Sequence, residues 1–165
     1  MKFKTSLDKL AKVITLLITI IFASIIIVQL ELFIDSVQSI TFFSILILVL
    51  IYLIVFLYRP LYYRTTDKFL VIHRFFSDVK INLIDIKSVE LLDKERLNGT
   101  IRIFGVGGLF GYWGKFHNSK IGTMIWYATR RNNTVLITTI NDKKLVLTPD
   151  EAELFVSELT AIISN

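Results

Sequence analysis

The segment SVQSITFFSILILVLIYLIVFLY, residues 36–58, decides the general architecture of this chain. It contains no charged residue in 23 positions, and from Ile40 onward Phe, Ile, Leu and Val dominate. A helix that crosses the hydrocarbon core of a bilayer needs roughly 20 such residues. Pro60 follows the segment and is typical of a helix end. The segment therefore predicts a membrane-spanning helix over residues 37–59.

A second apolar segment precedes the first in the chain. The run from Val13 to Val28 is apolar except for two threonines and one serine. It predicts a spanning helix over residues 13–30, joined to the next by an external turn over residues 31–36. A cleaved signal peptide is the alternative for this segment, because its start is basic. The run is longer than a usual signal core, however, and no small-x-small cleavage site follows it. A buried soluble hairpin is disfavoured because neither segment offers a polar face.

The charges that flank the two segments predict their orientation. Residues 1–12 carry four Lys and one Asp, whereas the connection between the segments holds two acidic residues and no basic one. Basic flanks stay on the cytoplasmic side of a membrane. We therefore expect a multi-pass protein of the cytoplasmic membrane with both termini cytoplasmic. Arg59, Arg64 and Lys68 follow the second segment and are candidate contacts to the anionic membrane surface.

Residues 60–165 have a different pattern and predict one mainly-β domain. Short alternating segments between turn-forming residues are typical of a sandwich or barrel. Seven strands are expected, near residues 62–66, 69–75, 79–83, 87–92, 122–129, 134–140 and 143–147. A closing helix is expected from Pro149, with Thr148 as its N-cap and Glu151 completing a capping box. Its apolar face, which we expect to cover an open end of the β domain, comprises Ala152, Phe155, Val156, Leu159, Ile162 and Ile163.

Three spaced motifs give this region a family resemblance. They are IRIFGVGGLFGYWGKF at residues 101–116, Tyr127-Ala128-Thr129-Arg130, and Thr148-Pro149-Asp150 before Phe155. Together they resemble a bacterial PH-like (pleckstrin-homology-like) domain family, over most of residues 62–159. The resemblance implies a PH-like fold of about seven strands closed by a C-terminal helix, in the inner membrane of a bacterium. A membrane hairpin before the domain is a familiar arrangement in that group.

Five of the seven glycines fall in the first of these motifs, among aromatic residues. This density predicts a tightly bent segment rather than a regular strand. The spacing fits neither a dinucleotide fingerprint nor a phosphate loop, because Phe110, Leu109 and Phe116 occupy required positions. The segment is either a bulged connection whose aromatics plug the core, or an exposed loop that touches lipid or a partner. The candidate interaction residues are Gly105, Gly107, Gly108, Phe110, Gly111, Tyr112, Trp113 and Gly114.

The composition argues against several other functions. There are two histidines, His73 and His117, and no cysteine, so no metal cluster of recognisable spacing exists in the sequence. No catalytic residue and no cofactor are predicted, and we expect no enzyme. The net charge of +5 is mild and not concentrated on one helix or loop, which disfavours nucleic acid. Phosphoinositide binding does not follow from the fold, because Lys68 lies beside Asp67 in the first hairpin loop.

These observations favour a membrane-anchored PH-like module that recruits or organises a protein partner at the cytoplasmic membrane face. The expected partners are the lipid bilayer and an unidentified protein, and a homo-oligomer stays open. One alternative is a module that senses lipid or the membrane surface directly. Another is an accessory subunit of a membrane transport or enzyme complex.

Overall fold

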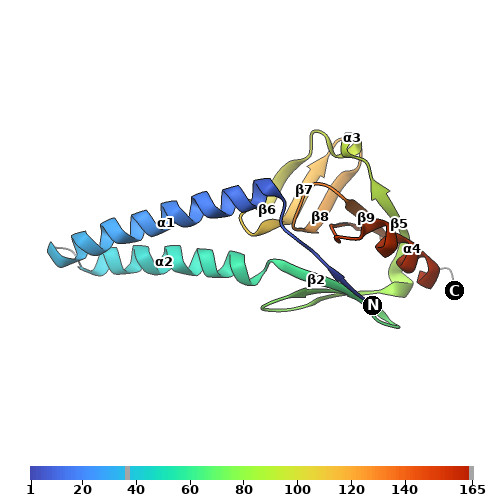
Figure 1. Ribbon diagram of the computed structural model, residues 1–165, viewed down its shortest axis with the longest axis horizontal. Helices are drawn as coiled ribbons and strands as arrows, with labels where there is room; N and C mark the ends of the chain where they lie inside the picture. Colours follow the sequence, from blue (N-terminus) through green and yellow to red (C-terminus); the bar gives the residue numbers. More distant parts are fainter. Residues whose placement is uncertain (36–37, 164–165) are drawn as a thin grey trace.

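The structure, a computed structural model, describes residues 1–35 and 38–163 of the chain. Two long helices, α1 (Lys9–Asp35) and α2 (Gln38–Leu57), form a hairpin that projects from a β domain (Figure 1). The predicted turn over residues 31–36 falls on the last turn of α1 and on Ser36. Ser36, the last residue of that turn, and Val37, where the second span was expected to begin, lie outside the described residues.

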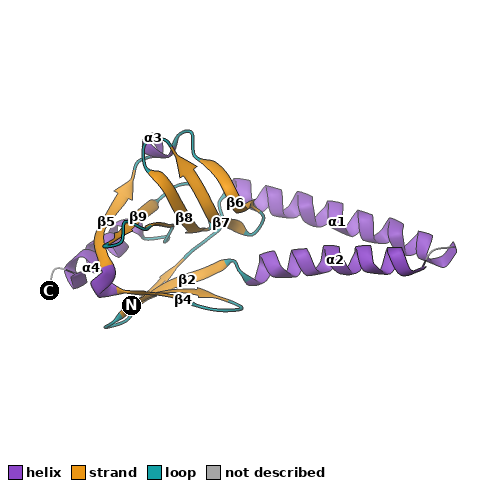
Figure 2. Ribbon diagram, turned by 180° about the vertical axis from the view of Figure 1, so that it is seen from behind, coloured by secondary structure: helices purple, strands orange, loops and turns teal. Residues whose placement is uncertain are grey.

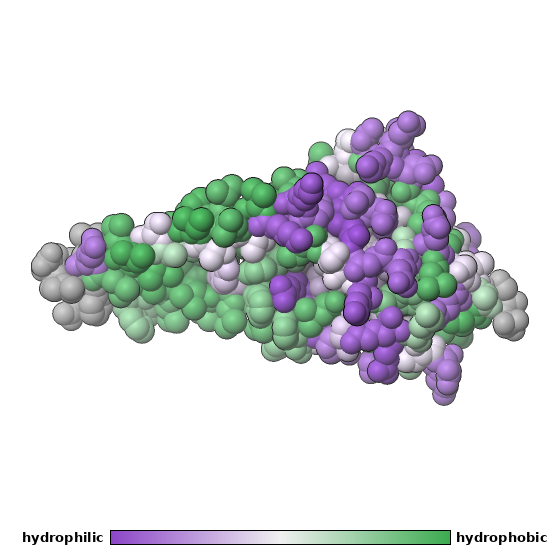
Figure 3. Space-filling model, in the orientation of Figure 1, coloured by the Kyte–Doolittle hydropathy of each residue, from purple (hydrophilic) through white to green (hydrophobic). Residues whose placement is uncertain are grey.

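Both helices of the hairpin are long and apolar enough to cross a membrane. Figure 3 shows a hydrophobic surface along the hairpin and a mostly polar surface on the β domain. The most apolar 18-residue window within Lys9–Glu31 is 0% buried, and Ile40–Leu57 is 6% buried. The core helix of a soluble protein would be covered, so this exposure favours a membrane environment.

Polar side chains connect the two helices inside their apolar zone. Thr19 and Tyr52 share a hydrogen bond between Oγ1 and the phenol oxygen of 2.7 Å. Ser44 donates from its Oγ to Oε1 of Gln29 over 2.9 Å. In hydrocarbon no water is present to satisfy such groups, and side chains on facing helices therefore pair with each other. These two bonds hold α1 against α2.

One sheet contains a strand that the sequence analysis did not predict. β1 (Lys2–Lys4) precedes the helical hairpin and pairs antiparallel with β2 (Pro60–Thr65), with Phe3 opposite Tyr63. Phe3 is 2% exposed and packs edge-on against Phe155, whereas Lys2 and Lys4 face solvent. The sheet has the order β1-β2-β3-β4 and is completed by β3 (Phe69–Arg74) and β4 (Val79–Asn82). The helical hairpin is therefore inserted between two paired strands.

The second sheet has six strands in the order β5-β9-β10-β8-β7-β6, and only β10 and β8 run parallel. Figure 2 shows the two sheets as separate layers. All seven predicted strands are present, and the barrel is not closed. The 3-10 helix η1 (Leu83–Asp85) leads into this sheet. Its strands are β5 (Ile86–Leu92), β6 (Ile101–Gly108), β7 (Gly111–Asn118), β8 (Gly122–Ala128), β9 (Thr134–Thr139) and β10 (Lys144–Leu147).

The main core lies between the two sheets and α4 (Ala152–Ile163). The predicted apolar face of this helix is confirmed, because Ala152, Phe155 and Leu159 are buried and the other three residues pack against the same cluster. The predicted helix start at Pro149 is wrong by three residues. Thr148 does not cap α4, because its hydroxyl accepts a hydrogen bond from the backbone N–H of Thr129 over 2.9 Å.

A second core covers the other face of the six-stranded sheet. Tyr112, Phe116 and Trp126 form its aromatic centre. The cluster is covered by Ala11 at the start of α1 and by Leu97 at the end of the short helix α3 (Lys94–Leu97). The first turns of α1 therefore belong to the β domain as well as to the hairpin.

Candidate membrane-proximal binding site

The glycine–aromatic segment forms a β-hairpin and not the bent, non-strand segment that was predicted. β6 and β7 pair antiparallel, with Gly105 opposite Gly114 and Gly108 opposite Gly111. A Cβ on Gly105 would lie 2.2 Å from the carbonyl oxygen of Trp113, and a Cβ on Gly114 would lie 2.3 Å from that of Phe104. The backbone φ is +111° at Gly105 and +120° at Gly114. The glycines therefore allow two strands to approach where side chains would separate them.

The tip of this hairpin inserts between the two long helices. Phe110 lies 5.2 Å from the ring of Tyr52 and 5.3 Å from that of Phe56, both on α2. On α1, the hydroxyl of Thr15 accepts the backbone N–H of Phe110 over 2.9 Å. A Cβ on Gly108 would lie 2.5 Å from Cδ1 of Ile14. The tip therefore contacts both helices, within their apolar stretch.

Phe110 occupies a strained backbone conformation at this tip. Its φ is 56°, in the left-handed region that costs an L-residue roughly 1–2 kcal/mol. Such strain persists only where surrounding contacts over-determine it, and it concentrates at functional sites. Here the contacts are the two aromatic rings of α2 and the Thr15 hydroxyl. Through these contacts, the strained turn attaches the helical hairpin to the β domain.

Arg59 lies between α2 and β2, among aromatic rings. Its guanidinium carbon is 4.5 Å from the ring centre of Phe56 and 5.5 Å from that of Phe75. Burial lowers the pKa of Arg59 below its ordinary value. Its Nε and the indole Nε1 of Trp113 are buried without a hydrogen-bond partner among the described residues. Trp113 is half-buried and stacks on Tyr58 at 5.9 Å. Aromatic and Arg side chains at a helix end are typical of a membrane–water interface.

The other two predicted basic contacts lie elsewhere. Arg64 on β2 lies opposite Lys2 on β1, and Lys68 lies in the turn between β2 and β3. That turn is at the end of β2 opposite Pro60, which pairs with Arg74 near α2. The structure therefore does not bring Arg59, Arg64 and Lys68 together on one surface.

The second and third family motifs converge on the segment between β1 and α1. Ser6 donates from its backbone N–H to Oδ1 of Asp150 over 3.0 Å, and its carbonyl accepts from Thr129 Oγ1 over 2.9 Å. Arg130 forms an ion pair with Asp150 and donates from Nε to the Ser6 carbonyl over 3.2 Å. We call this cluster the N-terminal latch; it comprises Thr5, Ser6, Thr129, Arg130, Thr148 and Asp150.

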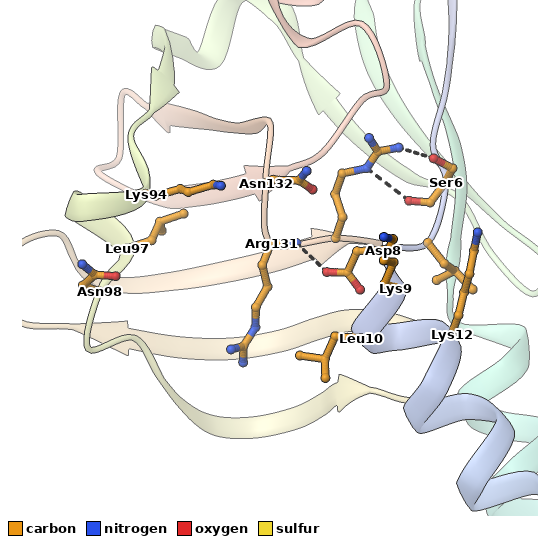
Figure 4. A pocket seen from close by; sticks show the side chains of 12 residues that line it. Ser6, Asp8, Lys9, Leu10, Lys12, Lys94, Leu97, Asn98, Arg131 and Asn132 are labelled. Carbon is orange, nitrogen blue, oxygen red and sulfur yellow. Dashed lines mark hydrogen bonds between the residues drawn. The ribbon is translucent and has the colours of Figure 1, made fainter.

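An open groove of about 670 Å³ lies beside the latch (Figure 4). Its walls are the start of α1, helix α3 and the loop between β8 and β9. At its rim, the carboxylate of Asp8 accepts the backbone N–H of Ala11 over 2.7 Å and that of Arg131 over 3.1 Å. Burial and the charge of Asp8 raise the pKa of Tyr112 to about 12. The groove's basic side chains are Lys9, Lys12, Lys94, Arg130 and Arg131.

Strand β6 forms one free edge of the six-stranded sheet. Its first half exposes three large apolar side chains: Ile101 is 62% exposed, Ile103 58% and Phe104 73%. Edge strands carry unpaired backbone groups and are usually short, charged or covered. Exposed apolar surface of this kind is typical of interaction sites in proteins.

The histidines lie apart from each other in the described structure. Nδ1 of His73 lies 2.6 Å from Asp78, and its ring stacks on Tyr62 at 4.4 Å. His117 is exposed on β7 beside Thr123, at 3.3 Å. Within residues 1–35 and 38–163, no group of three or more His, Cys, Asp or Glu could hold a metal ion.

A mainly-β domain that ends in a helix and carries two candidate transmembrane helices defines a membrane-associated module. Residues 61–162 match the bacterial PH domain family, which is more than half of the 165-residue chain, and the chain belongs to this family. The matched region begins within β2 and ends within α4, so β1 and both long helices lie outside it. Comparisons with curated proteins and with solved structures give no match.

Proposed function

We propose that this protein is a membrane-anchored binding module that holds a protein partner at the cytoplasmic face of the membrane. The helical hairpin supplies the anchor, and the basic residues on both flanks set the orientation, with both termini in the cytoplasm. The β domain supplies the binding surface. The observation that carries the proposal is the free, apolar edge of β6.

The chemistry of this edge defines the partner. An exposed strand edge accepts an extended segment that continues the sheet through main-chain hydrogen bonds. Apolar side chains on that segment would cover Ile103 and Phe104. The exposed Arg102 and Lys115 on this hairpin favour an acidic residue beside them. The proposed partner segment is therefore an extended, apolar strand with acidic flanks.

Photo-crosslinking in intact cells tests this function. A photoreactive residue at Phe104 should yield a crosslinked partner in the membrane fraction, and Ile103→Asp should abolish that adduct while the protein still folds. A photoreactive residue at Ile84, which is 79% exposed on η1, is the matched control and should yield no such adduct. Equal adducts from both positions, or an adduct that contains only a second copy of this chain, would contradict partner recruitment through β6.

A further inference from the structure

The groove beside the N-terminal latch gathers basic side chains from three elements of the domain. Its lining includes five basic residues and one acidic residue, Asp8, and of the five only Arg130 has an ion-pair partner among the described residues, Asp150. Lys9, Lys12 and Lys94 form no ion pair with a described residue. The Arg131 guanidinium lies over the ring of Tyr112 at 5.1 Å. Four cationic groups are thus free to meet an anion.

The position of the groove relative to the helical hairpin is equally informative. Lys9 and Lys12 lie in the first turn of α1, and the apolar stretch of that helix begins at Val13. Basic residues at this position lie at the level of the phosphates when the helix spans the bilayer. Leu10 is exposed on the same turn, next to the groove. An apolar side chain beside ammonium groups matches the junction of a lipid's headgroup and its acyl chains.

The groove next to this one has charge of the other sign. A neighbouring groove beside the start of α4 is lined by Asp93, Asp150, Glu151 and Glu153, with Lys94 as its one basic residue among the described ones. Figure 1 shows α4 at the end of the domain away from the helical hairpin. The basic groove includes the start of α1, and the acidic groove, which shares Lys94 with it, includes the start of α4. An anionic membrane surface favours this arrangement.

We propose that the basic groove binds the phosphate-bearing headgroup of an anionic phospholipid such as phosphatidylglycerol. Lys9 and Lys12 approach the phosphate from α1, and Lys94 approaches it from α3, on the opposite wall in Figure 4. A groove of about 670 Å³ has room for a phosphate and its glycerol. Residues 6–12 of its lining precede the family region at 61–162, so the site is a feature of this chain's membrane attachment.

Native mass spectrometry of the full chain in neutral detergent tests the site. Phosphatidylglycerol and phosphatidylcholine are titrated separately, and the dissociation constant of the first retained lipid is measured. Phosphatidylglycerol should bind more tightly, because only its headgroup carries net negative charge. Each basic residue near such a surface contributes about fivefold in affinity, so Lys9→Gln with Lys94→Gln should weaken phosphatidylglycerol binding roughly 25-fold. Phosphatidylcholine binding should not change.

The control variant is Lys80→Gln with Lys143→Gln, which removes the same charge from exposed positions outside the groove. It should leave phosphatidylglycerol binding within about twofold of the unmodified chain. Equal weakening by both variants would show a general charge effect and overturn the site. Displacement of the lipid by excess inorganic phosphate would assign the groove to a soluble anion instead. This proposal and partner recruitment through β6 share no residue, so either can fail alone.

Discussion

At the scale of single residues, the attachment of α1 depends on the N-terminal latch. Asp150 receives two hydrogen bonds from Ser6 and an ion pair from Arg130, and its own N–H donates to the carbonyl of Lys4 over 2.9 Å. The side chain of Arg130 is only 12% exposed. A partly buried pair of this kind is costly to break, because the remaining charge loses its partner.

Asp150→Ala should therefore destabilise the β domain by about 2 kcal/mol, less than a fully buried pair because Asp150 is partly exposed. Thermal unfolding of the full chain, followed by tryptophan fluorescence, measures this change. Lys87→Ala is the matched control. It breaks an ion pair to Asp142 whose side chains are 64% and 81% exposed, and it should change stability by less than about 0.5 kcal/mol. Equal effects of the two substitutions would show that the contacts of Asp150 in the latch stabilise the domain no more than an exposed ion pair does.

The local sequence pattern around Thr148 does not predict the tertiary contacts of the N-terminal latch. Thr148, Pro149 and Glu151 satisfy every rule for a helix start, yet the hydroxyl of Thr148 accepts a bond from Thr129 and α4 begins at Ala152. Such a tertiary contact overrides the local capping preference. The resemblance to a family did single out Thr129, Arg130 and Asp150, although it gave no reason for them. In the structure, the two motifs that contain these residues form hydrogen bonds with residues 5 and 6.

At the scale of elements, the strands with regular alternation were predictable and the others were not. The seven predicted strands carry side chains on two faces, and this alternation is a local signal. β1 has only three residues, and its partner Tyr63 lies 60 residues away from Phe3. β6 and β7 contain the five clustered glycines, which carry no side chain to show the alternation. Their pairing across the strands becomes visible only once Gly105 and Gly114 are seen opposite each other.

This pairing predicts that two nearby glycines differ sharply in their tolerance to change. Gly105→Ala should unfold the β6–β7 hairpin, because its Cβ would meet the backbone of Trp113 at a positive φ. Gly107→Ala should be tolerated, because its nearest neighbour is the flexible end of Arg102 at 3.2 Å. Amide hydrogen exchange of the full chain in detergent measures protection of β6 and β7 in each variant. Similar protection in both variants would contradict the close approach of the strands.

At the scale of the whole molecule, the helical hairpin and the β domain are packed against each other at several points. α1 is fixed through β1 and the latch, α2 continues directly into β2, and Phe110 is held between the two helices. Removal of a segment that ends within α1 would also remove Phe3 from the main core. We therefore expect the first helix to be retained as an anchor and not cleaved as a signal peptide. The two apolar helices were evident from composition, whereas their close attachment to the domain was not.

The proposed topology, in which the hairpin crosses the membrane and both ends of the chain lie in the cytoplasm, can be tested by labelling. The sequence contains no cysteine, so single cysteines can be introduced without a background. Glu31→Cys at the far end of α1 and Lys143→Cys in the β domain are treated with a membrane-impermeant maleimide in intact cells. Glu31→Cys should be labelled in intact cells, and Lys143→Cys should be labelled only after lysis. Labelling of Lys143→Cys in intact cells would contradict the orientation and the cytoplasmic placement of the binding domain.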